Sequence, residues 1–495
     1  MLASALAVVA LVLRIAAEAR NTILATGDYD EGVYFSASRW FTTGVMPYRD
    51  FVFIQPAGSV LVLTPFTGAL SGLFGTEVGF LAARFAAAGC GAATTAMVFF
   101  AARRLGGRAA AITAAALYAT MLAAIIAEGR VMLEPFMLAA GVGGVLLFLE
   151  RRSRRALITA GVLLGIAATI KITGAVFLLA LALGVLIAER QRVNDLATAL
   201  LAAVTTTFVI SLPFLWIAGP GPYLRQAVLS QLTRPDGANL PGNIDGATAR
   251  LGAFSSWGPL GSHLPLPTWF VALATLVTAA AIVRLVLLRS SAAITWAVIA
   301  VVPTLAFLVG PSFYSQYPVL AAPGLVIALG VLLATACDRI RLPHLAVGVA
   351  GVLAIALCGA QLKSTYLSPV APVNVAFERA IRDASARGCV FVDLGHIALM
   401  QDLLPQDGAG QPLVDPFGEL LYRNRDVSDR ALVVLRSPDA QASLRDAISD
   451  CPTVALRDPM GAQFAWGPDT VTWLTTTYDK VFDERGSTVW VRRGG

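Results

Sequence analysis

Three carboxylates stand close together near the start of the chain, at Asp28, Asp30 and Glu31. They precede a segment in which Val33, Trp40 and Phe41 recur at helical spacing, which predicts an amphipathic helix resting on a membrane surface. A carboxylate at the N-terminus of a helix is stabilised as the anion, and this suits a general base or a metal ligand. The same position also suits a side chain that only caps the helix. The residues alone leave these roles open.

A second group of charged residues lies in the segment EGRVMLEPFM, at Glu128, Arg130 and Glu134. The segment is predicted to join two membrane spans, so that Glu134 lies within the apolar boundary. A charge in that environment is costly and is usually kept for function. An ion pair with Arg130 or Arg84 would instead make Glu134 structural, and both interpretations stay open.

Lys171 and the segment FYSQYPVLAAP mark two further junctions between apolar runs. The ammonium group of Lys171 could extend along apolar surface to the membrane interface, or it could bind the phosphate of a phosphorylated lipid. Tyr314 and Gln316 lie where interfacial aromatic residues are common. Together with Asp28 and Glu128, they are our candidates for contacts to an acceptor or a metal ion. The three histidines are too scattered to predict a zinc site or a Ser-His-Asp triad.

The composition predicts the elements that must position these residues. Of the 495 residues, 57% are hydrophobic and 14% are charged, whereas soluble proteins carry about 25% charged residues. A large water-soluble enzyme is therefore excluded. The net charge of +6 does not indicate nucleic-acid binding, because the arginines fall in short clusters between apolar runs. A span needs about 20 apolar residues, which predicts eleven transmembrane helices near residues 2–22, 79–101, 109–127, 132–149, 156–171, 173–188, 196–217, 267–288, 292–310, 318–337 and 344–361.

The basic clusters set the predicted orientation. If the apolar stretch 57–73 does not cross the membrane, the arginine clusters near 103–108, 151–155, 190–192, 284–289 and 339–341 all lie on one side, which is the cytoplasm by the positive-inside rule. We therefore expect 57–73 to be a re-entrant or juxtamembrane helix and the N-terminus to be cytoplasmic. The loops 23–56 and 218–266 then face outward, as does the tail.

The tail from residue 362 to residue 495 has the composition of a soluble domain. A helix is expected over 374–387 and strands over 389–394, 431–435 and 487–491, which predicts a small extracytoplasmic α/β domain. Cys389 and Cys451 lie in this tail and could form a disulfide if it is extracytoplasmic. The predicted fold class is a polytopic α-helical membrane protein with a membrane domain over 1–361 and an α/β domain over 362–495.

The order of these motifs resembles that of the GT-C superfamily of membrane glycosyltransferases, in particular the branch of protein O-mannosyltransferases and aminoarabinose transferases. Members carry an Asp-Glu pair after the first span, an aromatic residue, a Gly and a proline pair opening an apolar helix. The counterparts here are Asp30-Glu31, Phe35, Gly44 and Gln55-Pro56-Ala57-Gly58. A second acid after an arginine is matched by Glu134 and Arg130, and a lysine after a short span by Lys171. The resemblance covers residues 1–361, with Ala57 in place of the second proline and Glu134 where Asp is frequent.

The resemblance implies transfer of a sugar from a polyprenyl-phosphate donor to a cell-envelope glycan, lipid or protein on the outer face of the plasma (inner) membrane. Asp30 would be the general base and inversion is expected, with Glu31 and Glu134 as further catalytic candidates. Lys171 and Arg130 would stabilise the departing lipid phosphate. No cofactor is certain, although a divalent ion held by Glu134, Asp28 and Asp30 stays open. Mannose and arabinofuranose are the expected sugars if the host is an actinobacterium.

Two other functions compete with transfer. A transporter or flippase of a lipid-linked substrate would use Glu134 and Lys171 along a path that reaches both membrane faces. It would also predict inward-facing acids, and the few at inward span ends, such as Glu150 and Glu189, stand beside arginines. A non-catalytic envelope scaffold would use the tail for interactions and would not need Asp30.

Overall fold

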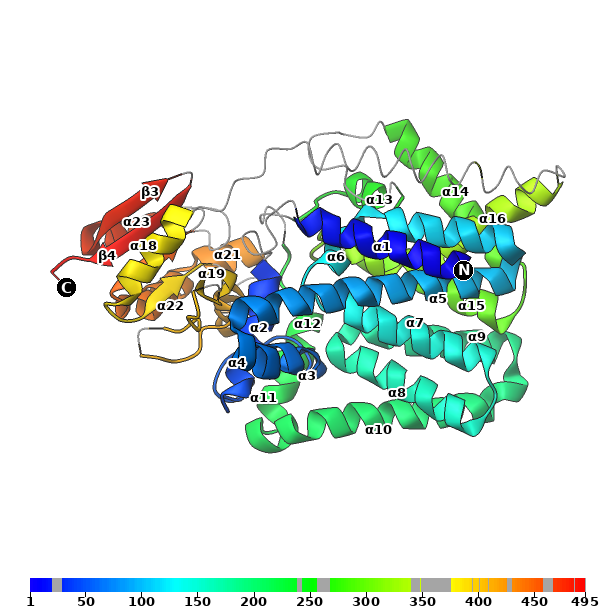
Figure 1. Ribbon diagram of the computed structural model, residues 1–495, viewed down its shortest axis with the longest axis horizontal. Helices are drawn as coiled ribbons and strands as arrows, with labels where there is room; N and C mark the ends of the chain where they lie inside the picture. Colours follow the sequence, from blue (N-terminus) through cyan, green and yellow to red (C-terminus); the bar gives the residue numbers. More distant parts are fainter. Residues whose placement is uncertain are drawn as a thin grey trace. The chain divides into compact units, whose positions relative to one another are not determined.

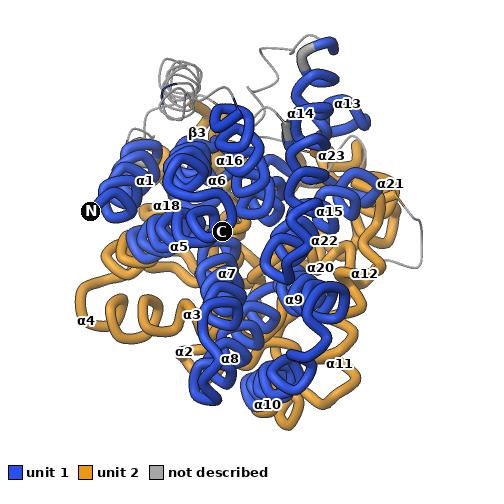
Figure 2. Tube along the Cα trace, turned by 90° about the vertical axis from the view of Figure 1, so that its right-hand side faces the viewer, with its two compact units in different colours: residues 1–20, 84–210, 244–370 blue, residues 21–83, 211–243, 371–495 orange. Residues whose placement is uncertain are grey.

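The computed structural model describes residues 1–19, 29–237, 243–255, 268–339, 348, 375–393, 395–399, 401–407, 409–424, 430–456, 466–484 and 486–494. The chain divides into two compact units that alternate along the sequence (Figure 2). Unit 1 contains residues 1–20, 84–210 and 244–370, and unit 2 contains residues 21–83, 211–243 and 371–495. The predicted division at residues 361 and 362 stays a prediction.

Unit 1 is built from helices (Figure 1). They are α1 (Leu2–Ala19), α5 (Thr76–Thr120, from Arg84 onward), α6 (Leu122–Gly129), α7 (Glu134–Glu150), α8 (Arg154–Ile170), α9 (Ala175–Ala188), α10 (Val193–Ala218, up to Ile210), α13 (Ala247–Ser255), α14 (Thr268–Val286), α15 (Ser291–Val309), the 3-10 turn η5 (Tyr317–Leu320) and α16 (Ala322–Arg339). Apolar side chains such as Leu201, Val204 and Phe208 of α10 are more than half exposed, as expected of a surface that faces lipid.

Small residues let these helices approach closely. A Cβ atom at Gly144 of α7 would meet Leu164 of α8, and one at Gly184 of α9 would collide with Thr295 of α15. Within a membrane, helices associate through such close packing because lipid offers no hydrophobic drive between them. Gly144 and Gly184 therefore serve helix packing.

Four helices of the described chain are long and apolar enough to cross a membrane: Thr76–Thr120, Arg190–Ala218, Ser291–Val309 and Ala322–Arg339. The pair α6 and α7 makes a fifth if it counts as one span bent by 112°. The predicted spans 79–101 and 109–127 begin on α5, which breaks at Gly106 and Gly107, where the φ of Gly107 is 75°. The chain is thus a multi-pass helical membrane protein. The count of eleven spans stays a prediction, and the span 344–361 falls almost wholly outside the described residues.

Unit 2 contains the first loop with the stretch that follows it, residues 211–243, and the tail. Its N-terminal part contains α2 (Tyr29–Thr42), α3 (Gly58–Thr64), the π-helical η1 (Pro65–Leu70) and α4 (Ser71–Phe74), and residues 211–243 add α11 (Pro220–Leu224), η4 (Arg225–Leu229) and α12 (Ser230–Leu232). The stretch 57–73 is helical, but its apolar helix Gly58–Phe74 is shorter than the four spans above. Its predicted re-entrant or juxtamembrane placement stays a prediction.

The tail forms a four-stranded sheet with helices packed against it (Figure 1). The strands are β1 (Val390–Val392), β2 (Thr453–Leu456), β3 (Tyr478–Glu484) and β4 (Ser487–Arg492), in the order β1-β2-β4-β3 with β1 and β2 parallel. The helices are α18 (Val375–Ser385), α19 (Gly395–Leu399), α20 (Pro416–Arg423), α21 (Ala431–Arg436), α22 (Pro438–Ser449) and α23 (Pro468–Thr477). Two apolar cores, one containing Phe391 and Trp490 and the other Phe377 and Val489, hold these layers together.

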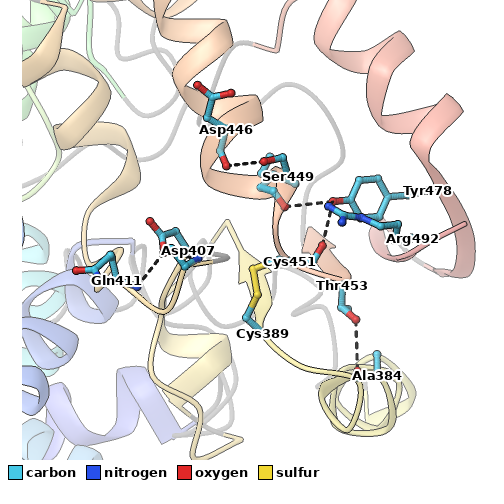
Figure 3. The surroundings of a disulfide bond; sticks show 12 residues. Ala384, Cys389, Asp407, Gln411, Asp446, Ser449, Cys451, Thr453, Tyr478 and Arg492 are labelled. Carbon is cyan, nitrogen blue, oxygen red and sulfur yellow. Dashed lines mark hydrogen bonds between the residues drawn. A yellow bond between two sulfur atoms is a disulfide. The ribbon is translucent and has the colours of Figure 1, made fainter. Parts of the chain in front are cut away.

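The structure tests two expectations for the tail, a strand over 431–435 and a disulfide between Cys389 and Cys451. The predicted strand over 431–435 is wrong, because these residues form α21. A short apolar run does not distinguish strand from helix, and here Ala431, Val434 and Leu435 are buried at helical spacing while Val433 is half exposed. Cys389 and Cys451 are joined by a disulfide with 5.1 Å between their Cα atoms, which ties the residue before β1 to the loop before β2 (Figure 3).

Candidate active site

Glu134 and Lys171 form an ion pair in unit 1, with Nζ 2.5 Å from Oε1. Glu134 is the first residue of α7, immediately after the 112° bend, and Lys171 follows the last residue of α8. Their side chains are 4% and 14% exposed. The sequence suggested Arg130 or Arg84 as the ion-pair partner of Glu134, whereas the structure pairs Glu134 with Lys171, 37 residues further along the chain.

The backbone around Lys171 is fixed by close contacts. Its carbonyl accepts the N–H of Gly174 at 2.8 Å. A Cβ atom at Gly174 would collide with the Ala167 carbonyl, so a larger residue does not fit there. These contacts fix the backbone where it turns directly after α8. From this position the Lys171 ammonium group reaches Glu134 at the start of α7.

The second carboxylate oxygen of Glu134 is buried and has no hydrogen-bond partner among the residues that the structure describes. Buried polar atoms are almost always bonded, so such an atom requires an explanation. The start of a helix favours the anion, and the pair with Lys171 compensates one oxygen. The other oxygen is available to accept a hydrogen bond from a ligand.

Aromatic side chains complete this cluster. The Lys171 ammonium lies 5.7 Å from the ring centroid of Tyr317, and the rings of Tyr314 and Tyr317 are 5.5 Å apart. Gln316 is buried beside them. Four of the candidate residues from three separate segments, namely Glu134, Lys171, Tyr314 and Gln316, thus gather in one part of unit 1.

Arg250 was missed by the sequence analysis. Its guanidinium donates hydrogen bonds to the carbonyls of Gly310 at 2.6 Å and Phe307 at 3.2 Å, and to that of Ile244 at 3.0 Å. It also lies 5.7 Å from the ring centroid of Phe313. Arg250 fixes α13 against the segment that leads to Tyr317. Because its partners are backbone carbonyls, no residue type in the sequence could have revealed it.

Glu128 occupies a different environment from Glu134. Its two oxygens accept hydrogen bonds from Arg14 Nε at 2.7 Å and from the Tyr118 hydroxyl at 2.6 Å, and all three side chains are fully buried. A Cβ atom at Gly91 would collide with both charged side chains. This geometry gives Glu128 a structural role within unit 1, and its acceptor or metal role stays a prediction.

Asp30 and Glu31 lie in unit 2, in the first turn of α2. The Tyr34 hydroxyl donates to Asp30 Oδ2 at 3.3 Å. Glu31 is fully buried, whereas Asp30 is only partly buried. Of the two acids, Asp30 is therefore the one that a substrate can reach without rearrangement. Asp28 lies outside the described residues.

Helix α2 is anchored within unit 2 by polar contacts. The Ser38 hydroxyl bonds to the Val60 carbonyl at 3.0 Å and to the Thr67 hydroxyl at 2.8 Å, and Arg39 donates to the Thr67 carbonyl at 3.1 Å. These bonds join α2 to α3 and η1. Among the side chains that the structure describes, no three His, Cys, Asp or Glu residues are placed to hold a metal ion together. The predicted divalent ion stays a prediction, because Asp28, one of its proposed ligands, lies outside the described residues.

Comparison with protein families finds a match over part of the chain. A model of the family described as dolichyl-phosphate-mannose-protein mannosyltransferase matches residues 63–217. This segment contains Glu128, Arg130, Glu134 and Lys171 but not Asp30. No curated protein matches the chain in sequence.

Solved structures share the fold over nearly the whole chain. ArnT from Cupriavidus metallidurans, in a structure bound to undecaprenyl phosphate, aligns with a TM-score of 0.63 and 16% identity over 99% of this chain and 98% of its own. The Archaeoglobus fulgidus oligosaccharyltransferase in complex with Zn and sulfate aligns with a TM-score of 0.61 and 13% identity over 99% of this chain and 73% of its own. The same archaeon's AglB, in complex with an inhibitory peptide and a dolichol-phosphate, gives 0.58 and 12% over 100% and 74%. These findings confirm the resemblance drawn from the motifs: the chain has the fold of the GT-C superfamily of membrane glycosyltransferases.

Proposed function

We propose that the chain transfers a sugar from a polyprenyl-phosphate donor to an acceptor of the cell envelope, with Asp30 as general base and inversion at the anomeric carbon. The observation that carries the proposal is the Lys171–Glu134 ion pair, which is nearly buried and leaves one carboxylate oxygen open. Burying a charge pair is costly, and membrane proteins usually keep such groups for function. An ammonium group beside an open hydrogen-bond acceptor suits a ligand that carries both a phosphate and hydroxyl groups.

The bound ligands of the structural relatives support a lipid-linked donor. ArnT was solved with undecaprenyl phosphate and AglB with a dolichol-phosphate, so two proteins of this fold bind a polyprenyl phosphate. An oligosaccharyltransferase of the fold was solved with a tethered acceptor peptide. The proposal follows these proteins in the class of donor, and it leaves a peptide, a lipid or a glycan as the acceptor.

The proposed reaction is a single displacement. The acceptor hydroxyl attacks the anomeric carbon as Asp30 removes its proton, and the bond between that carbon and the phosphate oxygen breaks. The lipid phosphate leaves with the bonding electron pair, and Lys171 and Arg130 stabilise its charge as it develops. Glu134 holds Lys171 in position and offers Oε2 to a substrate hydroxyl. The transferred sugar in this proposal is mannose or arabinofuranose.

The proposal includes an orientation. The N-terminus lies in the cytoplasm, and α2, the α6–α7 bend and the tail lie on the outer face of the plasma membrane. Sugar nucleotides are cytoplasmic, so an outward site needs a lipid-linked donor. A membrane-impermeant protease added to spheroplasts should remove the tail while leaving the N-terminus protected, and the opposite pattern would contradict this orientation.

The experiment that tests the function compares two lysine substitutions in membranes that contain the full chain. Each membrane receives a panel of radiolabelled polyprenyl-phosphate sugars. Lys171→Met should lower transfer about 10²- to 10³-fold, the cost of removing one preorganised charge-stabilising group. Lys480→Met is the matched control, because Lys480 is exposed on β3 and pairs with Asp483, and it should transfer at the wild-type rate. Equal rates for both variants would remove Lys171 from the mechanism. Translocation of the lipid-linked sugar without transfer would instead favour a flippase.

A further inference from the structure

Tyr29 stands directly before Asp30, and its hydroxyl is held by the tail. It donates to Asp415 Oδ1 at 2.8 Å and accepts the backbone N–H of Phe417 at 3.0 Å. The rings of Tyr29 and Phe417 meet edge to face with 6.3 Å between their centroids. All of these residues belong to unit 2. The first residue of α2 is thus fixed at one point of the tail, 386 residues away in sequence.

Asp415 is positioned to accept a hydrogen bond from the Tyr29 hydroxyl. It is buried and precedes α20, where Oδ1 also accepts the Gly418 N–H at 2.8 Å as an N-cap. A buried carboxylate is costly unless its hydrogen bonds are made. The Tyr29 hydroxyl therefore supplies part of the compensation that Asp415 needs, so that each side chain fixes the other.

Two further contacts hold α2 along its length. Trp40 Nε1 donates to the Pro405 carbonyl at 3.1 Å near the end of the helix. In its middle, α19 packs against α2, and a Cβ atom at Gly395 would lie 3.3 Å from Ser36 Oγ and 3.5 Å from the Gly32 backbone. The tail thus contacts α2 at its first turn, its centre and its last turn.

We propose that the tail is a positioning element for the helix that carries the general base, and that Tyr29 and Asp415 are its positioning residues. The inference rests on the proposed function of Asp30. Neither residue touches the reacting atoms in this account. Instead, the Tyr29–Asp415 bond fixes the direction of the first turn of α2 and hence the place from which Asp30 approaches the acceptor. A base misplaced by about 1 Å can lower the rate about a hundredfold.

The first test is hydrogen exchange of the full chain in detergent. Tyr29→Phe keeps the ring against Phe417 and removes only the hydroxyl. It should raise the exchange of α2 amides several-fold while leaving β2 and β4 protected. The matched control is Tyr478→Phe, which removes a hydroxyl within the tail itself and should leave α2 unchanged. The Tyr478 hydroxyl donates to the Ile448 carbonyl and to the Cys451 carbonyl (Figure 3). Unchanged α2 exchange in Tyr29→Phe would overturn the inference.

The second test separates positioning from general stability. Tyr29→Phe should lower kcat for sugar transfer about 10- to 100-fold with little change in the KM for the donor, and Tyr478→Phe should keep the wild-type kcat. Asp415→Asn retains an oxygen for Tyr29 and Gly418, so it should keep most of the activity that Asp415→Ala loses. If Tyr29→Phe has the wild-type kcat while Asp30→Asn is inactive, the positioning role is wrong and the proposed function is retained. If the wild-type chain transfers no sugar, the proposed function fails and the exchange result alone decides whether the tail holds α2.

Discussion

The side chains of Arg14 and Glu128 form an ion pair in which neither has any solvent-exposed surface. Arg14 lies on α1 and Glu128 on α6, while Tyr118, which donates to the same carboxylate, lies on α5. Removing one partner of a buried pair leaves an uncompensated charge and costs more than the pair itself contributes. The network therefore fixes three helices of unit 1 to one another.

Substitution of Arg14 by Met should destabilise unit 1 by about 3–5 kcal/mol, because Glu128 is left buried without its counter-charge. Thermal unfolding in detergent measures the effect. Arg103→Met is the control, since Arg103 is exposed on α5, and it should unfold at the wild-type temperature. The double substitution Arg14→Met with Glu128→Leu should recover part of the loss. Wild-type stability of Arg14→Met would show that the pair does not hold these helices.

These pairings show which part of the architecture the sequence can predict. The apolar runs and their arginine-rich ends predict helices of a membrane protein, because hydrophobicity and charge act locally along the chain. The partner of a charged residue is set by packing between distant segments. Lys171 and Glu134 are 37 residues apart in sequence, and Arg14 and Glu128 are 114 residues apart. The sequence therefore indicates Glu134 and Lys171 as candidates without indicating that they form a pair.

In the tail, too, local sequence patterns predict some of the helices and strands but not the contacts between distant segments. Helix α18 and strands β1 and β4 fall where the sequence predicts them, because α18 is amphipathic and each strand is a short run rich in β-branched and aromatic residues. Strands β2 and β3 were not predicted, and α21 was predicted as a strand. The contact of Tyr29 with Asp415 depends on the tail docking onto α2, which no local pattern encodes.

Loss of the disulfide should destabilise the tail. Cys389 and Cys451 are 62 residues apart, and in the chain-entropy account a loop of that size contributes about 4 kcal/mol by restricting the unfolded chain. The Cys389→Ser, Cys451→Ser double variant should therefore lose tail structure at a lower urea concentration, as followed by proteolysis. Thiol labelling of the untreated wild-type chain provides the complementary measurement. Rapid labelling of both cysteines in cells would contradict a bond formed in an oxidising compartment.

The stability of the tail should depend on the ionisation of Asp415. Burial raises the pKa of Asp415 above its ordinary value, and the Gly418 N–H, the Tyr29 hydroxyl and the charge of Arg234 lower it in part. A carboxyl whose pKa is higher in the folded than in the unfolded protein stabilises the fold while it is protonated. This contribution is complete below the unfolded pKa of about 3.9 and is lost as the pH rises through the folded pKa.

The matched variant for this pH dependence is Asp415→Asn, which cannot titrate. Its melting temperature relative to the wild type should rise as the pH increases from about 4 through the folded pKa, and then become constant. Measurement of both proteins across this range checks the sign. A difference that stays constant with pH, or one that falls, would show that burial of Asp415 does not raise its pKa.

The most direct test of the central claim is the rate of sugar transfer from a polyprenyl-phosphate donor by the Asp30→Asn variant. General-base catalysis contributes about 10²- to 10⁴-fold, and the variant should lose that factor while remaining folded and membrane-inserted. Asp50→Asn is the matched control from the same loop, because Asp50 pairs with Arg49 and accepts the Met46 N–H, and it should transfer at the wild-type rate. Transfer by Asp30→Asn at the rate of Asp50→Asn would contradict the assignment of Asp30 as the base.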